Sequence, residues 1–95
     1  MNREEAGKIL SAHLESFRLR SYTDLVSLMG DVQVAEVLGP SGAEYQIEID
    51  VMWDSPREKT NIRVSGMIDD GRFLAGLRPV NASFIVAPDG TFVGE

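Results

Sequence analysis

The chain contains no cysteine and only one histidine, His13. Without cysteine it has no disulfide, no thiolate metal site and no thiol nucleophile. A single histidine excludes a histidine-pair metal site, and neither a glycine-rich phosphate loop nor a nucleophile elbow is present. We therefore expect no metal and no cofactor. The lack of cysteine fits a reducing compartment, and the expected location is cytoplasmic.

Basic residues and long apolar runs are also scarce. Nine lysines and arginines face fifteen acids, which gives a formal net charge of −6. Because nucleic-acid binding and attraction to anionic lipid both need clustered basic residues, we expect neither partner. No apolar run approaches the roughly 18–20 residues of a membrane span. The charged start Met1–Glu5 is not typical of a signal peptide.

The chain does have the composition of one small globular domain. Its 95 residues are 43% hydrophobic and 25% charged, which predicts a single domain over residues 1–95. Asn2 and Glu5 form a capping box that predicts a helix over residues 3–19. Ser21 and Asp24 form another before a short helix over residues 22–29. One face of the first helix is apolar and includes Ala6, Ile9, Leu10, His13, Leu14 and Phe17.

Beyond Gly30 the hydrophobic period changes from helical to alternating. Residues 44–53 alternate between apolar and polar side chains, which predicts a strand with one buried face. A four-residue loop at 39–42 would pair Val34 with Ile47 on the apolar face. A three-residue loop would set Val34 opposite Glu48, which the face rule disfavours.

Two further turns extend the predicted sheet. A four-residue loop at 55–58 would pair Val51 with Ile62 on the apolar face and Asp50 with Arg63 on the other. Asp70-Gly71 predicts a type I′ hairpin whose returning strand lies at residues 73–77.

Pro79 ends that fourth strand, and residues 83–87 predict another strand with Phe84 and Val86 turned inward. The expected fold class is α+β. Two N-terminal helices pack on one face of a curved antiparallel meander of four to six strands.

This architecture resembles the cystatin-like fold and a trimmed member of the nuclear-transport-factor-two-like superfamily. Four segments also resemble a family of small uncharacterised bacterial proteins: Gly39–Gly42 with Tyr45, Val51–Asp54, Ile68–Gly71 and Phe84–Glu95. The resemblance implies a fold, and it implies no activity or site because this architecture serves many functions.

Three residues are candidates for a catalytic or ligand-binding cavity between helix and sheet. His13 lies on or beside the apolar stripe, and Glu36 points to the apolar face beside Tyr45 in the predicted register. A desolvated carboxylate there would act as a base, as an acid in this cavity does in enzymes of the wider superfamily. The alternatives are a hydrogen-bonded histidine at the core edge and a twisted or bulged strand that turns Glu36 to solvent.

The sheet face without helices supplies the other candidate site. Met67, Leu74 and Ile85 would form an apolar patch with a charged rim, which is the anatomy of an interface. A row of acids on the strand at 44–53 indicates either a site for a cation or a basic partner, or a solvated face.

The favoured function is therefore a non-catalytic protein-interaction or dimerisation module, with a homodimer or an unidentified protein as partner. The alternative is a small enzyme or small-ligand binder that uses His13, Glu36 and Tyr45.

Overall fold

Two helices begin the chain. The computed structural model describes residues 1–71 and 79–95, with α1 over Arg3–Arg18 and α2 over Tyr22–Ser27. The Asn2 side-chain oxygen accepts a hydrogen bond of 3.0 Å from the Glu5 N–H, so the predicted cap of α1 is confirmed. The Ser21 hydroxyl caps α2 in the same way. Neither described helix combines the length and apolar character needed to cross a membrane.

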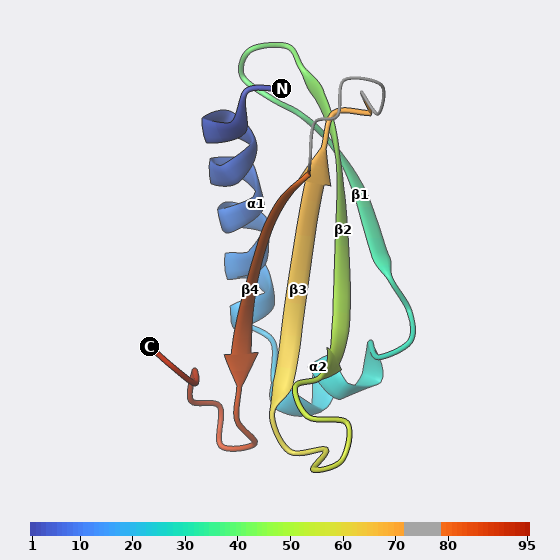
Figure 1. Cartoon of the computed structure of the whole chain (residues 1–95), viewed down its shortest axis with the longest axis vertical. Helices are drawn as coiled ribbons and strands as arrows, with labels where there is room; N and C mark the ends of the chain where they lie inside the picture. Colours follow the sequence, from blue (N-terminus) through green and yellow to red (C-terminus); the bar gives the residue numbers. More distant parts are fainter. Residues whose placement is uncertain (72–78) are drawn as a thin grey trace.

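A four-stranded antiparallel sheet follows the helices. Its strands are β1 (Gln33–Leu38), β2 (Glu44–Trp53), β3 (Ile62–Asp69) and β4 (Val80–Val86). They lie side by side in the order of the chain, so β1 and β4 are the two edges (Figure 1). The sheet is open and not closed into a barrel. The predicted α+β architecture, with two N-terminal helices before an antiparallel meander, is confirmed.

The core lies between the helices and one face of the sheet. Helix α1 packs mainly on β3 and β4, and α2 packs on β2 and β3. The helix and the sheet are packed tightly at Gly66, where an added Cβ would lie 2.9 Å from Leu10 Cδ1 and 3.1 Å from Ile49 Cδ1. Buried side chains of this core include Leu10, Leu14, Phe17, Leu25, Ile47, Ile49, Val51, Ile62, Val64, Ile68 and Phe84.

The predicted register of β1 is wrong by one residue. The Gly39 N–H donates to the Ala43 oxygen, and Val34 lies opposite Glu48. The turn therefore contains three residues, 40–42, and Gly42 has a φ of 88°. Because a shift of one residue reverses every side chain of a strand, Val34 and Glu36 point away from the helices.

The predicted register of β2 with β3 is also wrong, but it is shifted by two residues. Val51 lies opposite Val64 instead of Ile62, and Asp50 lies opposite Ser65 instead of Arg63. The loop extends over residues 55–60. A shift of two leaves every side chain on its predicted face, so the buried set is the expected one.

The strand beside β3 is not the predicted one. The predicted strand at residues 73–77 lies outside the described part of the chain. The strand that pairs with β3 in its place is β4. Val64 pairs with Phe84, and Ile68 pairs with Val80. Gly71 has a positive φ of 78°, but Asp70 does not, so the predicted type I′ turn, which needs a positive φ at both residues, is not formed. Phe84 and Val86 are buried, as the sequence predicted.

Arg18 of α1 contacts the C-terminal segment of the chain. Its guanidinium carbon lies 4.8 Å from the centre of the Phe84 ring and 4.4 Å from that of Phe92. Its two terminal nitrogens donate to the Glu95 carboxylate at 2.9 and 2.8 Å. Phe92 also forms an antiparallel bridge with Val86, on the side of β4 away from β3.

Candidate functional site

The face of the sheet opposite the helices, here called the open face, is the candidate site. Alternate residues of each strand point to it, since their neighbours face the core. On β1 these are Val34, Glu36 and Leu38. The other strands contribute Glu44, Gln46, Glu48, Asp50, Met52, Arg63, Ser65, Met67, Asp69, Asn81, Ser83 and Ile85.

Exposed apolar side chains gather at the β1 side of this face. Val34 is 56% exposed and Leu38 is 69% exposed, and Val32, just before the strand, is 47% exposed. Leu19 and Val93 are the other large apolar residues so exposed among those described. Three of the five thus belong to one short segment, which makes it a patch rather than scattered exposure.

The backbone of β1 is unpaired on its outer side. Because Gly39 donates to Ala43, the backbone groups of Val37, Ala35 and Gln33 face β2 by the alternation of an antiparallel ladder. Those of Val34, Glu36 and Leu38 therefore face outward. No described strand lies on that side.

The strand next to this patch carries acids. Three acids of β2 point to the open face: Glu44, Glu48 and Asp50. Glu44 lies opposite Leu38, and Glu48 lies opposite Val34. Asp50 lies next to Ile49, the residue opposite Gln33. Among the described strand residues on this face, Arg63 is the basic one. Its guanidinium donates to Asp54 at 2.8 Å and to the Ser83 hydroxyl at 3.3 Å, so this charge is already paired. The surface around β1 is therefore strongly acidic.

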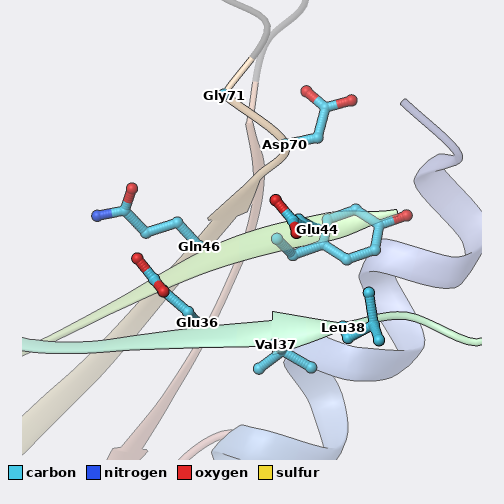
Figure 2. Close-up of a pocket in the computed structure, with 8 residues that line it drawn as sticks. Glu36, Val37, Leu38, Glu44, Gln46, Asp70 and Gly71 are labelled. Atoms are coloured by element: carbon cyan, nitrogen blue, oxygen red, sulfur yellow. The ribbon is translucent and has the colours of Figure 1, made fainter. Parts of the chain in front are cut away.

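A pocket of about 450 Å³ lies where β1 and β2 approach the turn after β3. In Figure 2, Glu36 and Gln46 lie side by side on the neighbouring strands, and Asp70 projects from the turn. The full lining is Glu36, Val37, Leu38, Glu44, Tyr45, Gln46, Asp70 and Gly71. Among the residues described, no three His, Cys, Asp or Glu side chains are arranged to hold a metal ion.

Tyr45 forms the inner wall of this pocket. It is only 3% exposed, and its hydroxyl is buried near the Glu5 carboxylate. Burial raises the pKa of the Tyr45 hydroxyl, and the nearby Glu5 carboxylate raises it further. The neutral phenol is thus favoured, which suits a structural side chain rather than a base.

Glu36 is not where the sequence analysis put it. It is exposed on the open face opposite Gln46 rather than desolvated against the core. The physical reason is the three-residue turn, which reverses the direction of every β1 side chain. Glu36 and Tyr45 line the same pocket but come from opposite faces of the sheet.

His13 lies apart from both. It is half-buried on α1, with its ring centre 5.7 Å from that of Phe17. Since α1 covers the helix side of the sheet and Glu36 points to the other side, the sheet separates the two residues. The predicted cavity lined by His13, Glu36 and Tyr45 together is not formed by the described residues.

The predicted interface residues lie partly within the described chain. Met67 and Ile85 are half-buried on the open face, where Met67 sits between Glu48 and Asn81. Leu74 lies outside the described residues. A shallow groove on this face is lined by Val32, Glu48, Asp50, Met52, Ser65, Gly66, Met67 and Asn81. Sequence reasoning missed Val32, Val34 and Leu38, because the register it chose turned them inward.

Comparison of the chain with protein-family models, with curated proteins and with solved structures finds no match. The functional argument therefore depends on the geometry of the open face and its edge.

Proposed function

We propose that this domain is a non-catalytic protein-interaction module that binds its partner through the open face. We also propose that it acts in the cytoplasm, where proteins without disulfides are common. One observation carries the proposal: Val32, Val34 and Leu38 are exposed on or beside an edge strand whose outer side faces no other described strand. Exposed apolar side chains beside a charged rim are the usual anatomy of an interface.

The geometry gives less support to the alternative of a small enzyme. A general base needs a partner acid or substrate within hydrogen-bond reach. His13 and Glu36 face opposite sides of the sheet, and the Tyr45 hydroxyl is buried with its pKa raised. Two of the acids that share the pocket with Tyr45, Glu36 and Glu44, are exposed to water, which weakens their effect on any reaction. The third, Asp70, lies 3.7 Å from the Met1 amino group.

Site-specific photocrosslinking tests the proposal. A photoreactive phenylalanine analogue replaces Val34 in one variant and Glu15, an exposed residue of α1, in a matched control. We expect irradiation in the native cell to give a discrete protein adduct from position 34 and none from position 15. Equal adducts from both positions, or none from position 34, would contradict the proposal.

A further inference from the structure

Among the described residues, strand β1 has only one of the devices that natural proteins use to protect a sheet edge, the charged side chain of Glu36. Its six residues, Gln33–Leu38, include no proline and no lysine. Its pairing with β2 is unbroken from Gln33 opposite Ile49 to Leu38 opposite Glu44, so it contains no bulge. Edges that remain in water are normally protected by such residues, by bulges or by a covering segment. A regular edge with so little protection is a template for another strand.

The outward row of β1 has a simple chemical order. Val34, Glu36 and Leu38 present an apolar, an acidic and an apolar side chain to the open face. Side chains on one face of a strand repeat every 6.5–7 Å or so, and an added strand has the same spacing. Its complement is therefore apolar, basic, apolar, with the basic residue opposite Glu36.

The surrounding charge extends this preference. Glu48 and Asp50 lie one strand further in, roughly 9–10 Å from an added strand. These two carboxylates add to the negative charge around Glu36, so they favour a basic segment over an acidic one. Since Arg63 is already paired with Asp54, no described cation on this face competes for these acids.

Charge also argues against a second copy of the chain as the occupant. Antiparallel pairing of two β1 strands about Glu36 would set the two Glu36 carboxylates opposite each other, which is destabilising. Other registers leave both carboxylates facing apolar residues. In each case two domains of net charge −6 would meet at acidic surfaces.

We propose that β1 accepts an extended basic segment of another protein as a fifth strand, with a lysine or arginine opposite Glu36 and apolar residues opposite Val34 and Leu38. This inference rests on the proposed interaction function and specifies its partner. The backbone groups of Val34, Glu36 and Leu38 supply the affinity, and the side chains supply the preference for a basic sequence.

Two short peptides test the inference directly. The probe is a capped, fluorescently labelled heptapeptide, Thr-Val-Thr-Lys-Thr-Val-Thr, and its control has glutamate in place of lysine. We expect the lysine peptide to bind at least about tenfold more tightly by fluorescence anisotropy, and to weaken as salt is raised. Equal binding of the two peptides, or no binding of either, would overturn the inference.

Two variants separate the backbone from the charge. Val34→Pro removes an outward N–H and keeps the bonds to β2, so it should abolish binding while the circular dichroism spectrum is retained. Glu36→Lys should invert the preference, so that the glutamate peptide binds more tightly. The control Glu58→Lys makes the same charge change in the loop after β2 and should leave the preference unchanged. Inversion by the control, or full binding by Val34→Pro, would overturn the inference.

Amide hydrogen exchange gives a reading that is independent of affinity. Bound peptide should slow exchange at Val34, Glu36 and Leu38, whereas protection confined to α1 would contradict the inference. Sedimentation that shows a dimer blocked by Val34→Pro would identify a second copy as the occupant and overturn it. If position 34 crosslinks to a partner but neither peptide binds, the inference of a basic added strand is contradicted, whereas the proposed interaction function is still supported.

Discussion

The backbone N–H of Gly39 donates a hydrogen bond of 2.8 Å to the carbonyl oxygen of Ala43. This contact closes the turn between β1 and β2, and it decides which backbone groups of β1 face β2. From Gly39 back along the strand, every second residue bonds inward, so Val34, Glu36 and Leu38 are left at the free edge. One hydrogen bond in a turn thus determines both the exposed side chains and the exposed backbone of the candidate site.

Replacement of Ile49 by alanine should strongly destabilise the domain. Ile49 is fully buried between α1 and the sheet, and loss of such a side chain costs about 2–5 kcal/mol. The matched control is Val34→Ala on the exposed edge, which should cost less than about 1 kcal/mol. Urea denaturation of both variants measures the difference. Equal losses would mean that Val34 is buried and that the register of β1 is different.

Gly66 should not tolerate a side chain. A Cβ there would meet Leu10 Cδ1 at 2.9 Å and Ile49 Cδ1 at 3.1 Å, so these packed side chains would have to move. We expect Gly66→Val to cost about 1–3 kcal/mol through overpacking. Gly7→Ala is the control, because no atom lies within 4 Å of the added carbon. It should stabilise α1 by about 0.5–1 kcal/mol. Thermal unfolding of the two variants should move in opposite directions.

The Tyr45 hydroxyl should make the domain sensitive to alkali. Burial raises the pKa of this group above its ordinary value of 10.0, and Glu5 adds to the effect. The associated stability is fully present below pH 10 and is lost as pH rises through the folded-state pKa. Tyr45→Phe should therefore reduce the loss of stability above pH 10.

Tyr22→Phe is the matched control for that experiment. It removes a hydrogen bond to the Thr60 oxygen and should cost about 0.5–1.5 kcal/mol at pH 7. Because it keeps Tyr45, the alkaline loss should remain. Unfolding midpoints at pH 7 and pH 11 distinguish the two. An alkaline loss of the same size in Tyr45→Phe would show that another group causes it.

The contact between Arg18 and Glu95 should make the domain sensitive to acid. The hydrogen bond from Arg18 lowers the pKa of the Glu95 carboxyl below its ordinary value. The stability from this group is present above the unfolded-state pKa and is lost as pH falls through the lower, folded-state value. In Glu95→Gln the fall in unfolding midpoint between pH 7 and pH 3 should be smaller. An unchanged fall would contradict the contact.

Much of the fold could be predicted from local sequence chemistry. The capping boxes at Asn2 and Ser21 act over three residues, so the sequence contains all that is needed to predict the starts of both helices. The alternation along β2 fixes its buried face for the same reason. The partners of β2 were harder to predict, because a shift of two residues keeps every face unchanged, and hydrophobic pattern alone cannot exclude it.

The candidate site could be predicted only in part. Met67 and Ile85 lie on the open face as expected, because their strands alternate clearly. The sequence pattern did not predict the exposed residues of β1, because it favoured the turn length that buries Val34. The three-residue turn contradicts that prediction, since it turns Val34 away from the core, and the alternation along the strand is the same in either register.

The bridge between Phe92 and Val86 makes the two edges of the sheet unequal. With the Val93 N–H bonded to the Ile85 oxygen, it closes the last residues of β4 to any added chain. The bridge covers only the end of β4, whereas no described strand lies beside any part of β1, so β1 offers an added chain the longer free edge. Pairing at the opposite margin is limited to the first residues of β4, which leaves the domain with one full-length edge for an added strand.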